Sequence, residues 1–354
     1  MKQLSQIYLL LLLITGVAGC APVNYYSQAV SGHLSLMLAG EPVDQLIASD
    51  RVEPALKARL ELSRKALAFA RDRLALPADN VYSDFVALDH PWVVVNLVAV
   101  PEFSLTPHRW CYPIVGCQAY RGYFDLTDAR SEQAKFDARQ YDTFLGGVTA
   151  YSTLGWFDDP LHTGFTNLAE GRMVALMFHE LAHRVVYIAD DTRFNESFAT
   201  AVELEGLRLW AREHDDPELY VRARQRLDYR EQTLAMVQNT SARLESLYKQ
   251  ELPTATLRAR KAEILSDLLA DYQQAAEQWQ QPGPFGANPR GLNNANLALF
   301  RQYNEYVPGF RQLLRELEYD FPAFYRQVET LSERPEPERR KRLNTLSERF
   351  HEDF

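Results

Sequence analysis

The stretch FHELAHRVVYIADDTRFNESFATAVE, residues Phe178 to Glu203, begins with two histidines four residues apart, His179 and His183. The apolar residues around them recur at helical spacing and predict a helix with a buried face. Side chains four positions apart project from the same side of a helix, so both imidazoles can meet one ion. Glu180 lies about a quarter of a turn further round, where its carboxylate can reach water beside the ion. The pattern H-E-x-x-H therefore predicts a metal site with a general base.

A catalytic zinc site needs three protein ligands and one open position, and the first helix supplies two of these ligands. Glu196 and Glu203 lie on a second predicted helix, which Asn195 is expected to cap. They are seven residues apart and share one helix face with Thr200, so spacing alone does not choose the third ligand. The alternative to a metal is a buried network of hydrogen bonds between histidine and glutamate. Either arrangement has to satisfy polar side chains that would be costly to bury without partners.

Outside this stretch, the sequence predicts an α+β fold that is mainly helical, with one domain over residues 34–331. Helical spacing, runs rich in Val, Phe and Trp, and turn residues divide this domain into four parts. They are a helical hairpin over 34–76, a small mixed β-sheet over 77–160, the two helices of the histidine stretch over 167–215 and a helical half over 217–331. Residues 332–354 are rich in charge and are expected to form a tail.

The composition excludes some classes of protein. With 354 residues, 46% hydrophobic and 24% charged, the chain is large enough for a real core and differs from disordered or fibrous sequences. Its formal net charge of −9 argues against nucleic acid as a partner, because binding to phosphates needs a concentrated basic surface.

Residues 1–19 have the features of an export signal: a basic residue, an apolar run too short to span a membrane, and small residues before Cys20. The sequence Val17-Ala18-Gly19-Cys20 resembles the lipobox of bacterial lipoproteins, in which the cysteine is lipidated and becomes the first mature residue. The resemblance implies a signal peptide, a lipidated Cys20 and a tether over 20–33. It places the protein at the bacterial cell envelope, attached to a membrane through its lipid. Ala21 after the cysteine favours the outer membrane, on the periplasmic side.

Two further cysteines, Cys111 and Cys117, are expected to form a disulfide. An exported chain meets an oxidising compartment, and Pro113 and Gly116 between the cysteines provide a turn that can bring them together. A pair of metal ligands is the alternative, but a lone C-x5-C pair is weak evidence for a zinc site. We therefore expect a bridge that closes a small surface loop.

The segments HELAH and NESFA, in this order, resemble the gluzincin zinc peptidases, and among them the zinc aminopeptidases. The resemblance implies a zincin-like fold with one zinc ion per chain. It implies His179, His183 and Glu196 as zinc ligands and Glu180 as general base. Glu203 and Thr200 share the helix face of Glu196 and are therefore expected beside the ligands. The connection between the two segments is shorter than in those aminopeptidases, which implies that the two helices are closely linked.

Most of the chain, from Cys20 to about Leu331, also resembles a bacterial family named after aminopeptidases. The segments WCYPIVGCQAYRGYF, GGVTAYSTLGWFDDP and NNANLALFRQYNEYVPGF carry this wider resemblance together with the two above.

Both resemblances imply hydrolysis of a peptide substrate, in which zinc polarises the scissile carbonyl and Glu180 moves a proton from water to the leaving amine. Gluzincins stabilise the oxyanion with a Tyr or His from a later helix, and Tyr303 is expected in this role in preference to Tyr306. Zincins bind the peptide along a strand upstream of the zinc helix. The residues expected there are Gly147, Val148, Thr149, Ala150 and Tyr151. A strand end without a ligand is the alternative.

One feature of the zinc aminopeptidases is absent from the sequence. They bind the free amine of the substrate with a segment G-x-M-E-N, and the corresponding strand here has no Glu. Asp158 or Asp159 could bind an ammonium group, although Asp residues before a proline commonly form turns. Exopeptidase action is therefore less well supported than metal-dependent hydrolysis.

The sequence thus predicts a zinc-dependent peptidase, named as an aminopeptidase by its resemblance. A non-catalytic envelope lipoprotein that binds protein or cell wall through a metal-stabilised fold is the alternative, and hydrolysis of a non-peptide amide is a third reading. Glu180 favours catalysis, because a structural zinc site usually closes its fourth position and has no use for a carboxylate that is not a ligand.

Overall fold

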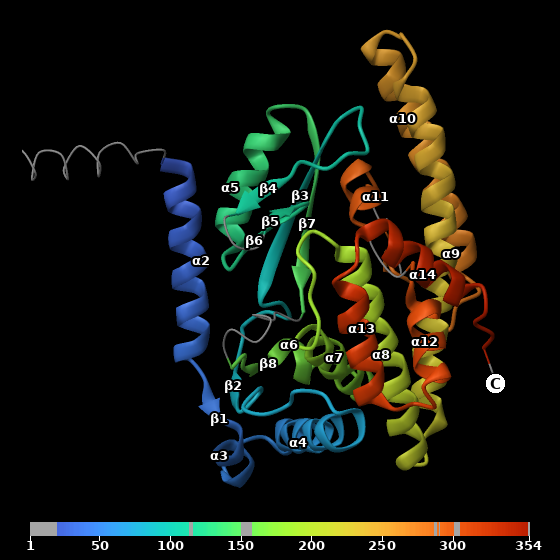
Figure 1. Cartoon of the computed structure of the whole chain (residues 1–354). Helices are drawn as coiled ribbons and strands as arrows, with labels where there is room; N and C mark the ends of the chain where they lie inside the picture. Colours follow the sequence, from blue (N-terminus) through green and yellow to red (C-terminus); the bar gives the residue numbers. More distant parts are fainter. Residues whose placement is uncertain are drawn as a thin grey trace, which may run out of the picture.

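The computed structural model describes residues 20–112, 116–149, 158–286, 289, 291–300 and 305–352. The helices are α2 (Cys20–Leu38), α3 (Val43–Ala48), α4 (Pro54–Leu74), α5 (Leu126–Asp137), α6 (Thr163–Thr166), α7 (Glu170–His183), α8 (Thr192–Glu213), α9 (Pro217–Tyr248), α10 (Thr254–Ala276), α11 (Asn294–Phe300), α12 (Val307–Glu316), α13 (Phe321–Ser332) and α14 (Glu336–Ser347). The strands are β1 (Glu41–Pro42), β2 (Asp84–Val86), β3 (Val94–Pro101), β4 (Trp110–Tyr112), β5 (Gly116–Gln118), β6 (Arg121–Tyr123), β7 (Tyr141–Val148) and β8 (Leu161–His162). This arrangement confirms the predicted α+β class and its mainly helical character (Figure 1).

The strands form three small sheets in the described part of the chain, where one mixed sheet was expected over 77–160. The sheets have the orders β1-β2-β8, β6-β3-β7 and β4-β5. The prediction missed α5, which separates β6 from β7. Asp125 caps this helix, because its side chain accepts hydrogen bonds from the backbone nitrogens of Thr127 at 2.6 Å and Asp128 at 3.1 Å.

The sheet β6-β3-β7 is covered by helices on both sides. Successive residues of a strand point to opposite faces, and β3 is buried along most of its length. Its residues Val95, Leu97 and Ala99 pack with Ala129 and Phe136 of α5, whereas Val98 and Val100 pack with Ala295 and Ala298 of α11. This two-sided burial explains why the strand reads as a continuous apolar run.

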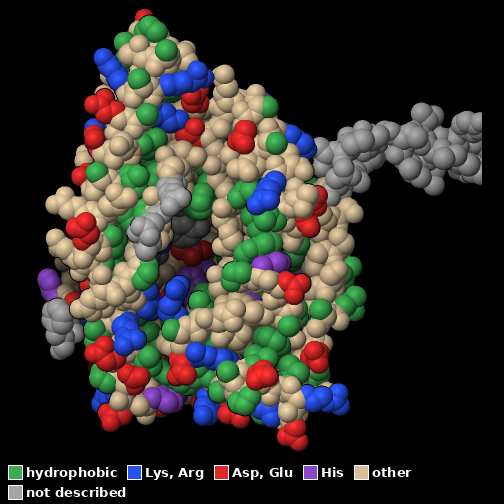
Figure 2. Space-filling model, turned by 180° about the vertical axis from the view of Figure 1, so that it is seen from behind, with side chains coloured by type: hydrophobic (Ala, Val, Ile, Leu, Met, Phe, Trp, Pro, Cys, Tyr) green, Lys and Arg blue, Asp and Glu red, His purple; other side chains and the backbone are tan. Residues whose placement is uncertain are grey.

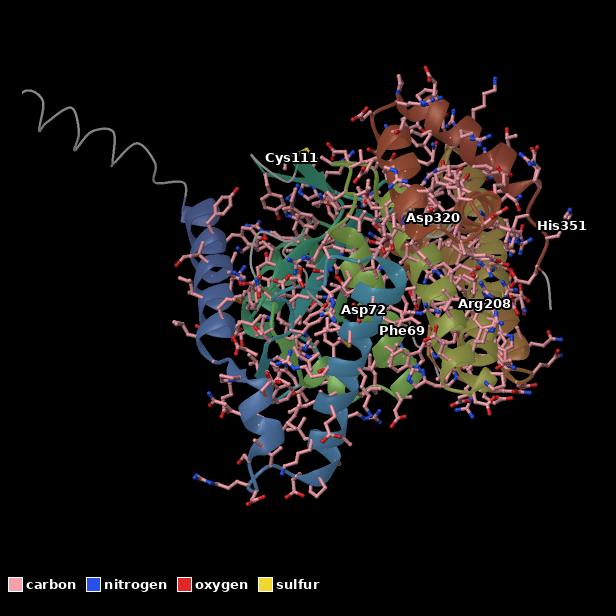
Figure 3. The ribbon with its side chains drawn as sticks, turned by 60° about the horizontal axis from the view of Figure 1, so that its bottom comes forward. Phe69, Asp72, Cys111, Arg208, Asp320 and His351 are labelled. Atoms are coloured by element: carbon pink, nitrogen blue, oxygen red, sulfur yellow. A yellow bond between two sulfur atoms is a disulfide. The ribbon has the colours of Figure 1, made fainter. Side chains whose placement is uncertain are left out.

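The largest core lies between α4, α7, α8 and the helices that follow α11. Phe69 of α4, labelled in Figure 3, stacks on Phe178 of α7 with ring centroids 5.8 Å apart. It also meets Trp210 of α8 edge to face at 5.2 Å. Because Phe178 directly precedes His179, this packing fixes the side of α7 that faces away from the two histidines.

The N-terminal part differs from its prediction. Residues 20–33, expected to form a tether, are helical and belong to α2; the only proline in α2, Pro22, lies in its first turn, where a helix tolerates it. The guanidinium carbon of Arg121 lies 3.7 Å from the ring centroid of Tyr25, so α2 contacts the β6 edge of the sheet. The hairpin expected over 34–76 consists of the short α3 packed on α4. The export signal expected over 1–19 lies outside the described residues.

The segment expected as a charged tail, 332–354, contains a core helix. In α14, Leu343 and Leu346 are fully buried, and the helix packs on α12. The prediction was wrong because only these two leucines, three residues apart, interrupt a run of charged residues. Their spacing is helical, but the apolar stripe is too narrow to stand out in the sequence.

Among the described residues, none of the helices combines the length and apolar character that crossing a membrane requires.

Candidate metal centre

The helices α7 and α8 bring the three predicted ligands together. His179 and His183 end α7, and Glu196 lies in the first turns of α8. The Nε2 atoms of the two histidines are 3.2 Å apart. Glu196 faces both of them, with its Oε2 3.4 Å from His179 Nε2 and its Oε1 3.7 Å from His183 Nε2.

These distances fit a zinc ion. Ligand atoms of a tetrahedral zinc site with bonds of about 2.0–2.1 Å are roughly 3.3 Å from one another. The ligand atoms of His179, His183 and Glu196 all lie within 4.8 Å of one another. Two imidazoles and one carboxylate are also a donor set that zinc prefers when a fourth position stays open. The residues present therefore fit the metal that the sequence predicts.

The structure separates the two glutamates that the sequence could not distinguish. Glu203 Oε2 lies 3.0 Å from Nδ1 of His179, on the side of the ring away from Glu196. A carboxylate in that position fixes the tautomer and orientation of a metal-binding histidine. Thr200, also predicted near the ligands, is half-buried on α8 between the two glutamates. Glu196 is thus the candidate ligand, and Glu203 supports His179.

The protonation of the two histidines differs in the absence of an ion. Burial would lower the pKa of His179, but hydrogen bonds with Glu196 and Glu203 outweigh burial and raise it well above its usual value. Burial and the charge of His179 lower the pKa of His183 to about 4. His179 therefore carries a proton between two carboxylates. Because metal-binding histidines must be neutral, an ion would displace that proton.

Glu180 is half-buried in an acidic environment. Burial raises its pKa to about 7, and the charges of Glu196 and Asp159 act in the same direction, against that of His179. A general base is most effective when its pKa lies near the working pH. Asp159 is 2% exposed, and its backbone oxygen accepts a hydrogen bond from Tyr82 N at 2.9 Å. Asp159 therefore lies inside the fold near Glu180, whereas Asp158 is exposed.

The sequence predicted Asn195 as the cap of α8, but this residue does not cap the helix. The cap is Asp191, whose side chain accepts from the backbone nitrogen of Phe194 at 3.1 Å. Asn195 is buried and bonds both backbone groups of Ile188, at 2.9 and 2.8 Å. It thereby fixes the connection 184–191, whose length sets how α7 and α8 meet. Asp191 also pairs with Arg339 of α14 at 2.5 Å.

The predicted disulfide is present and reaches the same connection. Cys111 and Cys117 are bonded across the β4-β5 hairpin. Oδ1 of Asp190 accepts a hydrogen bond from Cys117 N at 3.2 Å and one from Arg109 at 3.0 Å. A Cβ on Gly116 would lie 3.0 Å from the Asp190 carboxylate, so a glycine lets the hairpin approach closely. The hairpin therefore docks on the segment that joins the two helices with the candidate ligands.

The strand end proposed to bind substrate is only partly described. Gly147 and Val148 end β7, and Thr149 follows, whereas Ala150 and Tyr151 lie outside the described residues. A Cβ on Gly147 would lie 3.1 Å from Trp92, so packing accounts for this glycine without a ligand. The backbone oxygen of Val148 accepts from Val93 at 2.9 Å.

His162, at the start of α6, makes stability depend on pH. It is 1% exposed, its Nδ1 accepts from Gly164 N at 3.2 Å, and burial lowers its pKa from 6.5 to about 4. Above pH 6.5 the ring is neutral in both folded and unfolded chains, so the full stability is present. As the pH falls from 6.5 to 4, only the unfolded chain gains the proton, which costs about 3 kcal/mol of stability.

The variant His162→Asn keeps a capping oxygen for α6 but removes this titration. We expect the free energy of unfolding, measured in urea at pH 7 and pH 4, to fall by about 3 kcal/mol less in the variant than in the parent. Equal losses would show that His162 is not the titrating group.

The tyrosine proposed to stabilise the oxyanion, Tyr303, lies outside the described residues. Tyr306, the other candidate, is 4% exposed in the main core, and its backbone nitrogen donates to Ser197 Oγ at 3.1 Å. The neighbouring Asn293 and Asn294 attach α11 to the sheet through Thr143 and Glu102, both at 2.9 Å. These three residues are therefore accounted for by the fold.

Several polar residues near the centre were not predicted from the sequence. Tyr120, after the disulfide hairpin, is half-buried; burial raises its pKa to about 12, and Tyr187, Glu196 and Glu180 are among the charged or polar neighbours that add to this effect. Arg226 and Arg230 of α9 are also half-buried. The sequence could have indicated them, because Arg226 and Arg230 occupy two positions of a helical stripe that is otherwise apolar or small.

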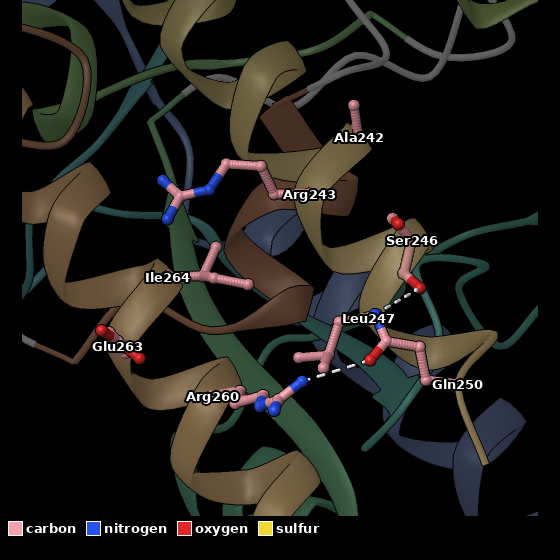
Figure 4. A pocket seen from close by; sticks show the side chains of 8 residues that line it. All are labelled: Ala242, Arg243, Ser246, Leu247, Gln250, Arg260, Glu263 and Ile264. Carbon is pink, nitrogen blue, oxygen red and sulfur yellow. Dashed lines mark hydrogen bonds between the residues drawn. The ribbon is translucent and has the colours of Figure 1, made fainter. Parts of the chain in front are cut away.

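Hollows on the surface of the described residues differ in character. Figure 2 shows one with acidic and histidine side chains at its floor and Lys and Arg side chains nearby. The groove in Figure 4, of about 610 Å³, lies between α9 and α10 and is lined by Arg243, Arg260 and Glu263 among others. It contains none of the candidate ligands, so we do not assign chemistry to it.

Comparison with known proteins identifies the family. A family model described as "Putative aminopeptidase" matches residues 24–343, which include His179, Glu180, His183, Glu196 and the disulfide. Comparisons with curated proteins and with solved structures find no match. Since the family model covers most of the 354 residues, the chain belongs to the family described as "Putative aminopeptidase", a name that points to a peptide hydrolase.

Proposed function

We propose that this protein is a zinc-dependent peptidase with a zincin-like active site. The observation that carries the proposal is the convergence of His179, His183 and Glu196, with Glu180 beside them and not among the ligands. A purely structural zinc site would not need that fourth carboxylate.

The residues around the centre have separate roles in this proposal. His179, His183 and Glu196 hold the ion, which when bound supplies a Lewis acid and a water of lowered pKa. Glu203 orients His179 through Nδ1. Glu180 takes a proton from water and passes it to the leaving amine, a role that suits a carboxyl group with a pKa of about 7. Tyr303 remains our candidate for the hydroxyl that stabilises the oxyanion, and residues 147–151 for the strand that binds the peptide.

We further propose that the protein is attached to the bacterial envelope by a lipid on Cys20. The support is the lipobox-like sequence that ends at this cysteine. The peptide substrate would then be met in the periplasm, where the disulfide between Cys111 and Cys117 is stable.

The proposal is tested on the chain from Ala21 onward. We expect elemental analysis to find one zinc per chain, and a peptide library to contain substrates whose cleavage stops with a chelator and returns with zinc. The position of cleavage, read by mass spectrometry, distinguishes removal of the first residue from internal cleavage. If the folded protein, prepared with zinc in excess, binds no metal, the result would instead support the non-catalytic lipoprotein.

A further inference from the structure

The outer side of α2 carries a row of exposed apolar side chains, which we call the outer stripe. Tyr26, Val30, Leu34 and Leu38 follow one another at intervals of four residues and therefore lie along one side of the helix. These residues are 45%, 57%, 53% and 85% exposed. The other exposed large apolar residues among those described lie singly on other segments. The outer stripe is thus where exposed apolar side chains gather in the described part of the chain.

The opposite side of α2 packs on the rest of the protein. Leu36 is buried in a cluster with residues of β2 and β3. Nε2 of Gln28 donates to the backbone oxygen of Gly122 at 3.4 Å, and its Oε1 accepts from the backbone nitrogen of Phe124 at 3.2 Å. A Cβ on Gly32 would lie 2.4 Å from the Phe124 ring, so the helix approaches the sheet closely. The outer stripe therefore faces away from the protein, at the edge seen in Figure 1.

The helix α2 lacks the charged residues that usually cover the outer side of a surface helix. Its 19 residues include no Lys, Arg, Asp or Glu. By contrast, the exposed residues of α14 include Glu338, Arg340 and Lys341. Apolar side chains are costly to leave in water, and a contiguous exposed row of them is typical of an interaction surface.

The outer stripe is too small for a stable contact with a second copy of the chain. Between Tyr26 and Leu38 the helix rises about 18 Å, and with a width of about 10 Å the stripe covers about 200 Å². A stable protein interface takes about 800 Å² from each partner. A membrane surface makes no such demand, because it accepts a single helix whose apolar side enters the boundary between headgroups and acyl chains.

The proposed lipid brings the outer stripe close to a membrane. The helix α2 begins at Cys20, and Tyr26 lies six residues later, about 9 Å along the helix axis. A group held near its binding surface by a short tether acts at an effective concentration on the order of millimolar. Four apolar side chains with a weak affinity for the membrane surface are therefore sufficient to keep the helix on it.

We infer that the outer stripe of α2 lies in the surface of the membrane to which Cys20 is attached, so that the helix runs along the membrane. The inference rests on the proposed lipid attachment at Cys20. Tyr26 suits this position, because a tyrosine has an apolar ring and a polar hydroxyl and is favoured where one end is apolar and the other wet. Since the opposite side of α2 is packed on the sheet, the membrane would also set the orientation of the whole protein.

The test attaches the protein to vesicles without the cell's own lipidation. The chain from Cys20 onward is coupled through this cysteine to maleimide-bearing lipid in vesicles of phosphatidylethanolamine and phosphatidylglycerol. The coupling is specific, because the other two cysteines, Cys111 and Cys117, are joined in a disulfide. Brief treatment with hydroxyl radicals, followed by mass spectrometry, measures how exposed each side chain is. The same chain with its Cys20 thiol blocked and no vesicles is the reference.

The far end of the helix gives the decisive measurement. Leu38 lies 18 residues after Cys20, about 27 Å along the axis, so a helix that stood upright on the membrane would leave it exposed. We expect the oxidation of Leu34 and Leu38 to fall about five-fold or more on vesicles, because both would enter the headgroup boundary. Val221 of α9, which is 42% exposed, is expected to be oxidised equally with and without vesicles.

Two variants with the same added charge assign the protection to the outer stripe. Leu34→Glu places a carboxylate within the stripe, whereas Ser35→Glu places it at the next residue, which is also exposed but lies off the stripe. We expect Leu34→Glu to remove most of the protection at Leu38 and Ser35→Glu to keep it. Circular dichroism and thermal unfolding check that both variants are folded.

Four outcomes would overturn the inference. Protection confined to Tyr26 would show that α2 stands upright, and equal protection in the two variants would show that the outer stripe is not the contact. Protection in the concentrated protein without vesicles, together with a dimer in sedimentation, would assign this side of α2 to a second copy. These three results leave the lipid attachment intact. A mature protein isolated from cells with no lipid on Cys20 would instead refute the attachment, and the inference with it.

Discussion

A Glu180→Gln variant is expected to bind zinc as the parent does and to lose peptide hydrolysis by on the order of 10²–10⁴-fold. Glutamine has nearly the same shape as glutamate but cannot accept the proton that Glu180 takes from water. The ligand atoms that converge belong to His179, His183 and Glu196, so the substitution leaves the metal site complete. The measurements are kcat on the best library peptide and zinc per chain.

A matched control separates this effect from a general loss of charge. Glu213→Gln changes a carboxylate at the end of the same helix pair, where it forms a surface ion pair with Arg73. We expect this variant to keep both zinc and activity. Loss of zinc from Glu180→Gln would show that Glu180 is a ligand and that its assignment as the base is wrong.

The second large effect is expected on metal affinity, from Glu196→Ala compared with Glu203→Ala. Glu196 faces Nε2 of both histidines, so its removal takes away a proposed ligand. Glu203 acts through Nδ1 of His179, and loss of such an outer partner typically weakens affinity 10- to 100-fold. We therefore expect Glu196→Ala to lose more affinity than Glu203→Ala, measured by competition with a zinc chelator.

The reverse order of affinities would exchange the roles of the two glutamates. Thermal unfolding of the metal-free proteins serves as the control for folding. It is needed because both carboxylates bond His179 in the absence of an ion and therefore contribute to the metal-free structure as well.

The helices around the site were predictable because their apolar residues recur over several turns. Phe178 and its neighbours mark α7 clearly, and α8 follows with the same strength. By contrast, α14 shows only Leu343 and Leu346 within a charged run. The short α5 was hidden between two strands for a similar reason. A helix could be predicted when its apolar residues recurred clearly over several turns, and it was missed when they did not.

The site was predictable from the sequence except where the packing of one helix on another decides which residue faces the histidines. His179 and His183 are one turn apart on one helix, so local geometry brings them together. Glu196 and Glu203 are seven residues apart and share a face of the next helix, so only the way α8 packs on α7 distinguishes them. Asn195 shows the same limit. Its residue type suits a helix cap, but the fold uses it to bond Ile188 and leaves the cap to Asp191.

The connection 184–191 gives the metal centre an unusual dependence on the rest of the chain. Its Asp190 is held by the disulfide hairpin, and its Asp191 by Arg339. A chain that ended after α8 would contain every ligand and still lack the C-terminal contact that positions the second helix. A metal centre that depends on both contacts would be complete only when the hairpin and α14 are in place. Bound metal would then report that the whole polypeptide has folded, and an incomplete chain would stay inactive.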